Sequence, residues 1–168
     1  MAQRKYNYTQ FKQGRYTPVN KEKYNGKHTP EYRSSWELKF FRWCDRNNNV
    51  LKWSSESTVV PYVSPVDGKI HRYFVDGNVI IKEGNTVKSY LVEIKPYAQT
   101  QPPKESKRKK KTTILYEKIT YAVNQAKWDA ARQYAAKKKM EFFQLKMKLE
   151  NTLYQKNKYF KYGIQSYS

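Results

Sequence analysis

The sequence predicts an α/β fold in which a helix is followed by three strands, a long helix and a last strand, giving a mixed central sheet flanked by helices. Three observations carry this prediction. Apolar residues recur at helical spacing from Trp36 onward, and two β-rich runs, 69–82 and 87–95, flank a Gly84-Asn85 pair. Residues 113–138 then form a helical pattern without Gly or Pro, before an alternating strand pattern.

The first helix is expected over residues 35–46, ahead of three consecutive asparagines. Ser34 and Glu37 have the spacing of a capping box, in which the two residues satisfy free backbone donors at a helix start. One helical face then carries Trp36, Phe40, Trp43 and Cys44. As the only cysteine, Cys44 has no intramolecular disulfide partner, and we expect it to pack in the core.

Two hairpins are expected next. Residues 57–63 are predicted as a strand, with Pro61 indicating an edge or bulge position, and 64–68 as its turn. The second hairpin joins the runs 69–82 and 87–95 through Gly84-Asn85, a pair suited to the positive φ of a two-residue turn. The sequence therefore predicts three antiparallel strands in succession.

This second hairpin places acidic residues together in a chain with few of them. Lys and Arg number 34 against 14 Asp and Glu, for a formal net charge of +20. If the turn closes at Gly84-Asn85, paired residue numbers sum to 169 and Asp76 lies opposite Glu93. Opposed Cβ atoms are roughly 4.5–5.5 Å apart, close enough for two carboxylates to share a divalent cation. Lys95 emerges on the same face as Glu93, because side chains alternate along a strand.

The alternative is an ordinary cross-strand pair beside a strand-end lysine. Opposed like charges destabilise a sheet unless a cation or proton lies between them, so we favour a metal-dependent site. His71 is five residues before Asp76 and is expected on the opposite face. Carboxylate ligands without a Cys and His cluster suit Mg²⁺ or Mn²⁺ better than zinc.

A basic loop is expected over residues 97–112. It contains Pro102-Pro103 and then a run in which six of eight residues are basic: Lys104, Lys107, Arg108, Lys109, Lys110 and Lys111. Because the loop follows Lys95, we expect it beside the site, where its charges would contact a phosphate backbone without sequence preference. A solvated charge run or a localisation-like patch is the alternative.

The long helix is expected over 113–138, with its packing face formed by Leu115, Ile119, Ala122, Ala126 and Ala130. Gln125 and Lys127 are candidates to reach the site from this helix, but two residues apart they point roughly 200° from each other. We prefer Gln125, against the alternative of a solvated residue. Residues 140–148 alternate as a half-buried strand.

Both ends of the chain are basic and rich in tyrosine. Residues 1–30 contain seven Lys and Arg against one acid, so they are expected to be an arm that is disordered or ordered only on a partner. Residues 151–168 form a similar tail. Both segments suit nucleic acid and protein partners equally. No long apolar run or signal segment is evident, so we expect an intracellular protein and no membrane partner.

Asp76, sixteen residues, then Glu93-x-Lys95 matches the PD-(D/E)xK nuclease motif, with Val75 in place of the expected proline. The wider string resembles the head completion nucleases of T-even-type tailed phages over residues 14–148. The segments that carry the resemblance are 32–37, 43–47, 52–56, 61–62, 64–69, 71–74 and 91–96. The motif alone is weak; the whole string is specific.

The resemblance implies a restriction-endonuclease-like αβββαβ core, here over residues 31–150, and Mg²⁺-dependent hydrolysis of double-stranded DNA. Asp76 and Glu93 would hold the metal, Lys95 would assist, and Gln125 is a further candidate. Glu37 has two interpretations, a helix cap or the acidic ligand that many of these nucleases carry on their first helix.

The resemblance also implies the setting: phage head completion, with neck, portal or head-vertex proteins as partners. The protein would act in the host cytoplasm during assembly and stay at the head-tail junction. No nucleotide cofactor is expected. The competing interpretation is a non-catalytic neck or head-vertex protein that binds DNA and virion proteins. A repair or transposition nuclease on the same core is a third, which the long string argues against.

Overall fold

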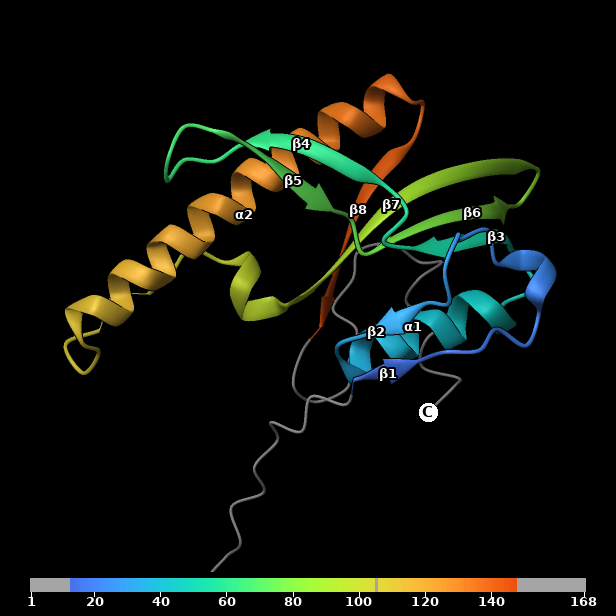
Figure 1. The fold of residues 1–168 in the computed structure, drawn as a ribbon, viewed down its shortest axis with the longest axis horizontal. Helices are drawn as coiled ribbons and strands as arrows, with labels where there is room; N and C mark the ends of the chain where they lie inside the picture. Colours follow the sequence, from blue (N-terminus) through green and yellow to red (C-terminus); the bar gives the residue numbers. More distant parts are fainter. Residues whose placement is uncertain (1–12, 105, 148–168) are drawn as a thin grey trace, which may run out of the picture.

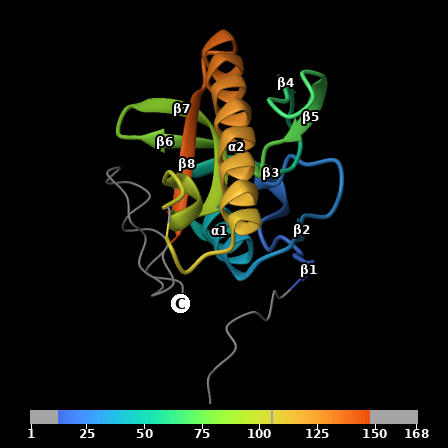
Figure 2. The ribbon, with the colours of Figure 1, turned by 90° about the vertical axis from the view of Figure 1, so that its left-hand side faces the viewer.

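The computed structural model describes residues 13–104 and 106–147. A four-stranded sheet in the order β3-β6-β7-β8 forms its centre. One apolar cluster joins one sheet face to α1 (Ser35–Arg46), and a second joins the other face to α2 (Lys111–Lys137) (Figures 1 and 2). The molecule is therefore built of three layers, with the sheet between two helical layers.

The sheet is mixed. Strands β3, β6 and β7 are antiparallel neighbours, and β8 pairs with β7 in parallel after the chain returns through α2. Their bounds are β3 Val50–Ser55, β6 Gly77–Glu83, β7 Thr86–Pro96 and β8 Glu141–Met147. With both helices, the order α1, β3, β6, β7, α2, β8 confirms the predicted αβββαβ fold.

A second, two-stranded sheet is inserted between β3 and β6. It is the hairpin of β4 (Val59–Val63) and β5 (Ile70–Phe74), whose turn includes Gly68 at a φ of 68°. Tyr62 and Tyr73 lie on its inner side and pack in the cluster that includes α2. The hairpin therefore lies over the same sheet face as α2 (Figure 1).

This insertion corrects the strand assignment. The strand predicted over 57–63 is β4, which belongs to the hairpin, whereas the first strand of the central sheet is β3, which was not predicted. The run 69–82 is two strands rather than one, because the chain leaves the hairpin at Val75-Asp76 and enters the sheet at Gly77. The predicted run of three successive strands is therefore divided between two sheets, the β4–β5 hairpin and the central sheet that contains β6 and β7.

The predicted register of the second hairpin is confirmed. Gly77 pairs with Val92 and Glu83 with Thr86, so paired numbers sum to 169 along β6 and β7. Gly84 has a φ of 60°, which supplies the left-handed residue that the tight turn needs. Asp76 stands one residue before the first pair of this ladder.

Gly77 is required by packing. A Cβ built there would lie 2.7 Å from Cε1 of Phe40, a fully buried residue of α1. The missing side chain of this glycine admits the helix against β6.

Helix α2 packs through only part of the predicted face: Ala126 and Ala130 pack against the second apolar cluster, as predicted, whereas Ala122 is exposed. Its buried residues are Asn124, Trp128, Ala131 and Ala135. Leu115 and Ile119, expected to pack, are 59% and 41% exposed. The helix packs through its second half, and its first half extends away from the sheet (Figure 1).

Residues 13–30 also differ from the prediction of an arm that orders only on a partner. Strand β1 (Gly14–Arg15) pairs with β2 (Glu31–Tyr32), and η1 (Lys21–Lys23) lies between them in sequence. Buried Asp45 on α1 fastens the segment, accepting hydrogen bonds from Tyr16 Oη at 2.6 Å, Val19 N at 2.8 Å and Asn20 N at 2.9 Å.

Cys44 is buried in the core, as predicted. The basic loop begins with a short helix, η2 (Tyr97–Thr100). The lysines and the arginine of its basic run are exposed. Residues 1–12 of the predicted arm and the tail 151–168 lie outside the described residues. Neither helix of the described ranges is apolar enough over its length to cross a membrane.

Candidate active site

The candidate site lies where the chain passes between the sheet and the hairpin. Strand β3 leaves the sheet through Glu56, and β5 returns to it through Val75 and Asp76. The two crossings are bonded together, since Glu56 N donates to Asp76 O at 3.2 Å and Val75 N donates to Thr58 O at 3.0 Å. A pocket of about 370 Å³ opens beside these crossings.

Val75 therefore has a bonded backbone N–H where the motif name has proline. A proline would have no N–H to give Thr58, and the Thr58 carbonyl would lose this partner. The departure from the motif fits the local structure.

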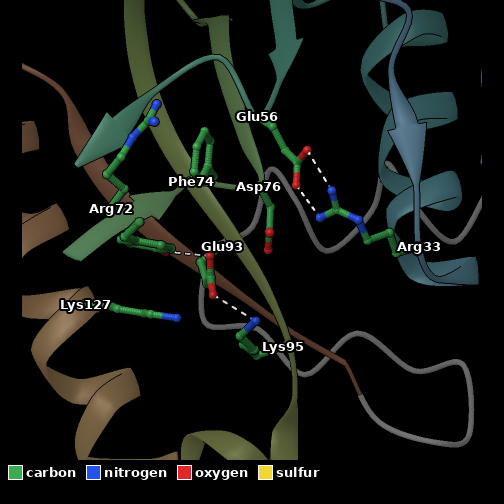
Figure 3. Close-up of a pocket in the computed structure, with 9 residues that line it drawn as sticks. Arg33, Glu56, Arg72, Phe74, Asp76, Glu93, Lys95 and Lys127 are labelled. Carbon is green, nitrogen blue, oxygen red and sulfur yellow. Dashed lines mark hydrogen bonds and ion pairs between the residues drawn. The ribbon is translucent and has the colours of Figure 1, made fainter. Parts of the chain in front are cut away.

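Asp76, Glu93 and Lys95 meet in this pocket (Figure 3). Lys95 Nζ lies 3.0 Å from Glu93 Oε1, and Tyr73 Oη donates to Glu93 Oε2 at 2.5 Å. Asp76 Oδ2 accepts from Ile94 N at 2.7 Å. Both carboxylates are thus held by neighbours on β5 and β7, and the predicted convergence of the three side chains is present.

The charges in the pocket act on one another. Burial and the Glu93 carboxylate raise the pKa of Asp76 well above its usual range, against the lowering effects of Lys95 and the Ile94 N–H. Burial lowers the pKa of Lys95, but the charges of Glu93 and Asp76 outweigh it, so that pKa is raised. Burial and Glu93 also raise the pKa of Tyr73, which keeps its hydroxyl protonated. Lys95 therefore stays cationic beside Glu93, which is only 2% exposed.

Glu56 is a third acid at the pocket, and it was not predicted as a site residue. Its carboxylate is held by both guanidinium nitrogens of Arg33, at 2.5 and 3.2 Å. Its φ of 47° is unusual for a residue with a side chain and marks the sharp exit of β3 from the sheet. Only the resemblance of 52–56 to other nucleases gave a sequence signal for it.

Glu37 forms the helix cap. Its Oε1 accepts from Ser34 Oγ at 2.9 Å and its Oε2 from Arg33 N at 2.8 Å, while Glu37 N donates to Ser34 Oγ. Both carboxylate oxygens are committed to the helix start, and Glu37 does not line the pocket. Its charge still raises the pKa of Asp76 as a minor cause.

From α2, Lys127 lines the pocket, whereas Gln125, the preferred candidate, does not. The Lys127 ammonium lies over the rings of Tyr62 and Tyr73, 5.6 and 5.7 Å from their centroids. Two aromatic faces attract the cation and aim it at the site.

The basic loop does not line the pocket. Its cations come from four other elements or junctions: Arg33, Arg72, Lys95 and Lys127. Of these, only Lys95 and Lys127 were candidates from the sequence. His71 is exposed, and its ring pairs with Asp67 at 2.9 Å, away from the site as expected.

Comparison with known proteins agrees with this architecture. Residues 47–146 match the family described as TnsA-like endonuclease N terminal. The chain is also 37% identical to the head completion nuclease of Enterobacteria phage T4 over 135 residues, which are 77% of this chain and 87% of that protein.

The chain belongs to the TnsA-like endonuclease family and is a homologue of the head completion nuclease of phage T4. The family match begins directly after α1 and ends within β8, and so contains Glu56, Asp76, Glu93, Lys95 and Lys127. As a head completion nuclease homologue, the chain carries the nuclease fold, and its convergent acid and lysine side chains lie within the matched region.

Proposed function

We propose that this chain is a divalent-cation-dependent DNA nuclease that acts in phage head completion. The observation that carries the proposal is the convergence of the Asp76 and Glu93 carboxylates with the Lys95 ammonium in one pocket. Two adjacent carboxylates in a protein of net charge +20 have a ready explanation in a bound cation.

The donor set suits Mg²⁺, with Mn²⁺ as an alternative. Asp76 and Glu93 would hold the ion, and in the described ranges no three His, Cys, Asp or Glu side chains gather as a complete metal cage. Mg²⁺ commonly binds through one or two carboxylates and completes its shell with water and substrate phosphate. When bound, it would polarise the scissile phosphate and lower the pKa of an attacking water.

The remaining side chains have roles that follow from their contacts. The Tyr73 hydroxyl and Ile94 N–H orient the two carboxylates before substrate arrives. Lys95 would orient the attacking water or neutralise charge that develops on the phosphate. Lys127 and Arg72 would contact the phosphates on either side, since both line the pocket.

Affinity for double-stranded DNA would come from charge rather than base contacts. Lys104, Lys107, Arg108, Lys109, Lys110 and Lys111 are exposed and would bind the phosphate backbone away from the pocket. Cleavage should therefore show little sequence specificity.

The setting follows from the T4 homologue. We propose that the chain trims or clears DNA at the packaged head, enabling head-tail joining. It would work in the host cytoplasm during assembly and stay at the head-tail junction, with neck, portal or head-vertex proteins as partners.

Plasmid cleavage tests the proposal. The protein should cleave the plasmid with Mg²⁺ or Mn²⁺ and should stop cleaving when EDTA is added. Cleavage should fall at least about 100-fold in each of the variants Asp76→Asn, Glu93→Gln and Lys95→Ala. Glu83→Gln is the matched control, because Glu83 is at the far end of β6 and pairs with Lys88. Cleavage that persists in EDTA and in all three variants would refute this catalytic assignment. No cleavage under any of these conditions would favour a structural, DNA-binding component.

A further inference from the structure

A second hollow adjoins the catalytic pocket. It measures about 840 Å³ and lies between residues 24–31 of the N-terminal segment and the β4–β5 hairpin. Glu56, Arg72 and Phe74 line both hollows, so the two are continuous at the rim of the pocket.

Arg72 and Phe74 form the junction. Tyr73 between them is buried against Glu93, so by strand alternation both neighbours lie on the outward face of the hairpin. Phe74 is 45% exposed, and the Arg72 guanidinium lies 4.9 Å from its ring centroid. Among the described residues no acid pairs with Arg72, which leaves its charge available to a ligand.

The wall formed by the N-terminal segment, across the hollow from Arg72 and Phe74, keeps a positive charge after its ion pairs are counted. Arg15 is paired with Glu31 at 3.0 Å, and Glu56 is held by Arg33. In the part of the chain that the structure describes, Lys27 has no acidic partner. Its charge and that of Arg72 therefore face this hollow from opposite sides.

We propose that this hollow holds a single-stranded DNA segment leading into the catalytic pocket. Phe74 stacks on an unpaired base, while Arg72 and Lys27 contact phosphates. An aromatic ring stacks on any base whose face is free, which a paired and stacked duplex does not offer. The inference rests on the proposed nuclease function and specifies a substrate with an unpaired region next to the cleaved bond, such as a frayed end or gap.

The proposed single-strand track is the hollow that contains Lys27, Arg72 and Phe74. Measuring DNA binding without divalent cations tests this track separately from catalysis. A labelled 15-nucleotide poly-dT strand and a 15-base-pair duplex are titrated in EDTA over a range of salt concentrations. Phe74→Ala should weaken single-strand binding about 10-fold and duplex binding little. Arg72→Ala and Lys27→Ala should each reduce the slope of log affinity against log salt by about 0.7 for the single strand.

The controls match the chemistry removed. Ile70→Ala deletes an exposed apolar side chain on β5 outside both hollows, and Lys82→Ala removes an exposed charge on β6. Both should bind the single strand as the unaltered protein does. Equal losses in Phe74→Ala and Ile70→Ala, or equal losses for duplex and single strand, would overturn the proposal.

The catalytic variant keeps the two hypotheses apart. Asp76→Asn should bind the single strand at least as well as the unaltered protein while losing cleavage. If it still cleaves, the proposed catalytic site is wrong and the track is unaffected. If it loses cleavage but Phe74→Ala binds normally, only the track is wrong.

Discussion

Gly77→Ala tests how helix α1 and the site depend on each other. The new Cβ would lie 2.7 Å from Phe40 Cε1 and 3.1 Å from its Cζ, where carbon atoms normally rest roughly 3.5–4.0 Å apart. Phe40 is fully buried, so β6 or the ring must shift by about 1 Å. Such overpacking costs about 1–3 kcal/mol of unfolding free energy.

Urea denaturation measures the cost. With a slope of about 2 kcal/mol per molar urea, a loss of about 2 kcal/mol lowers the midpoint by about 1 M. Cleavage should fall as well, because Asp76 precedes Gly77 and misplacement of a reacting group by about 1 Å can cost about 100-fold.

The double variant Gly77→Ala/Phe40→Leu makes the argument specific. The smaller side chain should relieve the clash and recover part of both losses, with a coupling of about 1 kcal/mol or more. Gly84→Ala is the control, since its φ of 60° strains any side chain but its Cβ would meet open space far from Asp76. A Gly77→Ala protein as stable as the original, or no recovery with Phe40→Leu, would refute the reasoning.

Three further predictions concern other parts of the molecule. Lys127→Ala should reduce cleavage about 10-fold, while Gln125→Ala should leave it unchanged; equal effects in a kinetic comparison would remove Lys127 from the site. Burial raises the pKa of Asp45, but hydrogen bonds from Tyr16 and two backbone N–H groups outweigh it, so that pKa is lowered in the folded protein. Asp45 therefore stabilises the fold fully above its unfolded pKa of about 4. This stabilisation is lost as the pH falls through the lower folded pKa. Asp45→Asn should therefore lower the denaturation midpoint at pH 7 and flatten the acid limb below about pH 4, and an unchanged acid limb would contradict the assignment. Replacing Lys107 and Arg108 with Ala should reduce the slope of log duplex affinity against log salt by about 1.8, and no change in slope would mean that the loop does not contact phosphate.

Local signals predicted much of this fold. The Ser34-Glu37 capping box placed the start of α1, and the Gly84-Asn85 turn fixed the register that aligns Asp76 with Glu93. Both depend on residues a few positions apart, so the sequence carries them directly. The convergence of Lys95 with the two acids followed from the same register.

Other features depend on packing between distant segments, and the sequence did not reveal them. Strand β3 does not alternate cleanly between buried and exposed residues, and its pairing with β6 shifts register between Val50 and Lys52. Tyr16 binds Asp45 across 29 positions, a contact that composition does not indicate. The contact of the Lys127 ammonium with the two hairpin tyrosines also joins distant segments, and the sequence does not show it.

The position of the cation tests the central claim most directly. Crystals soaked in Mn²⁺ would locate the ion by its anomalous scattering. Our account predicts one strong peak within about 2.5 Å of both the Asp76 and Glu93 carboxylates, absent from crystals of Asp76→Asn. A peak elsewhere, or none at this pair while the same protein cleaves DNA with Mn²⁺, would contradict it.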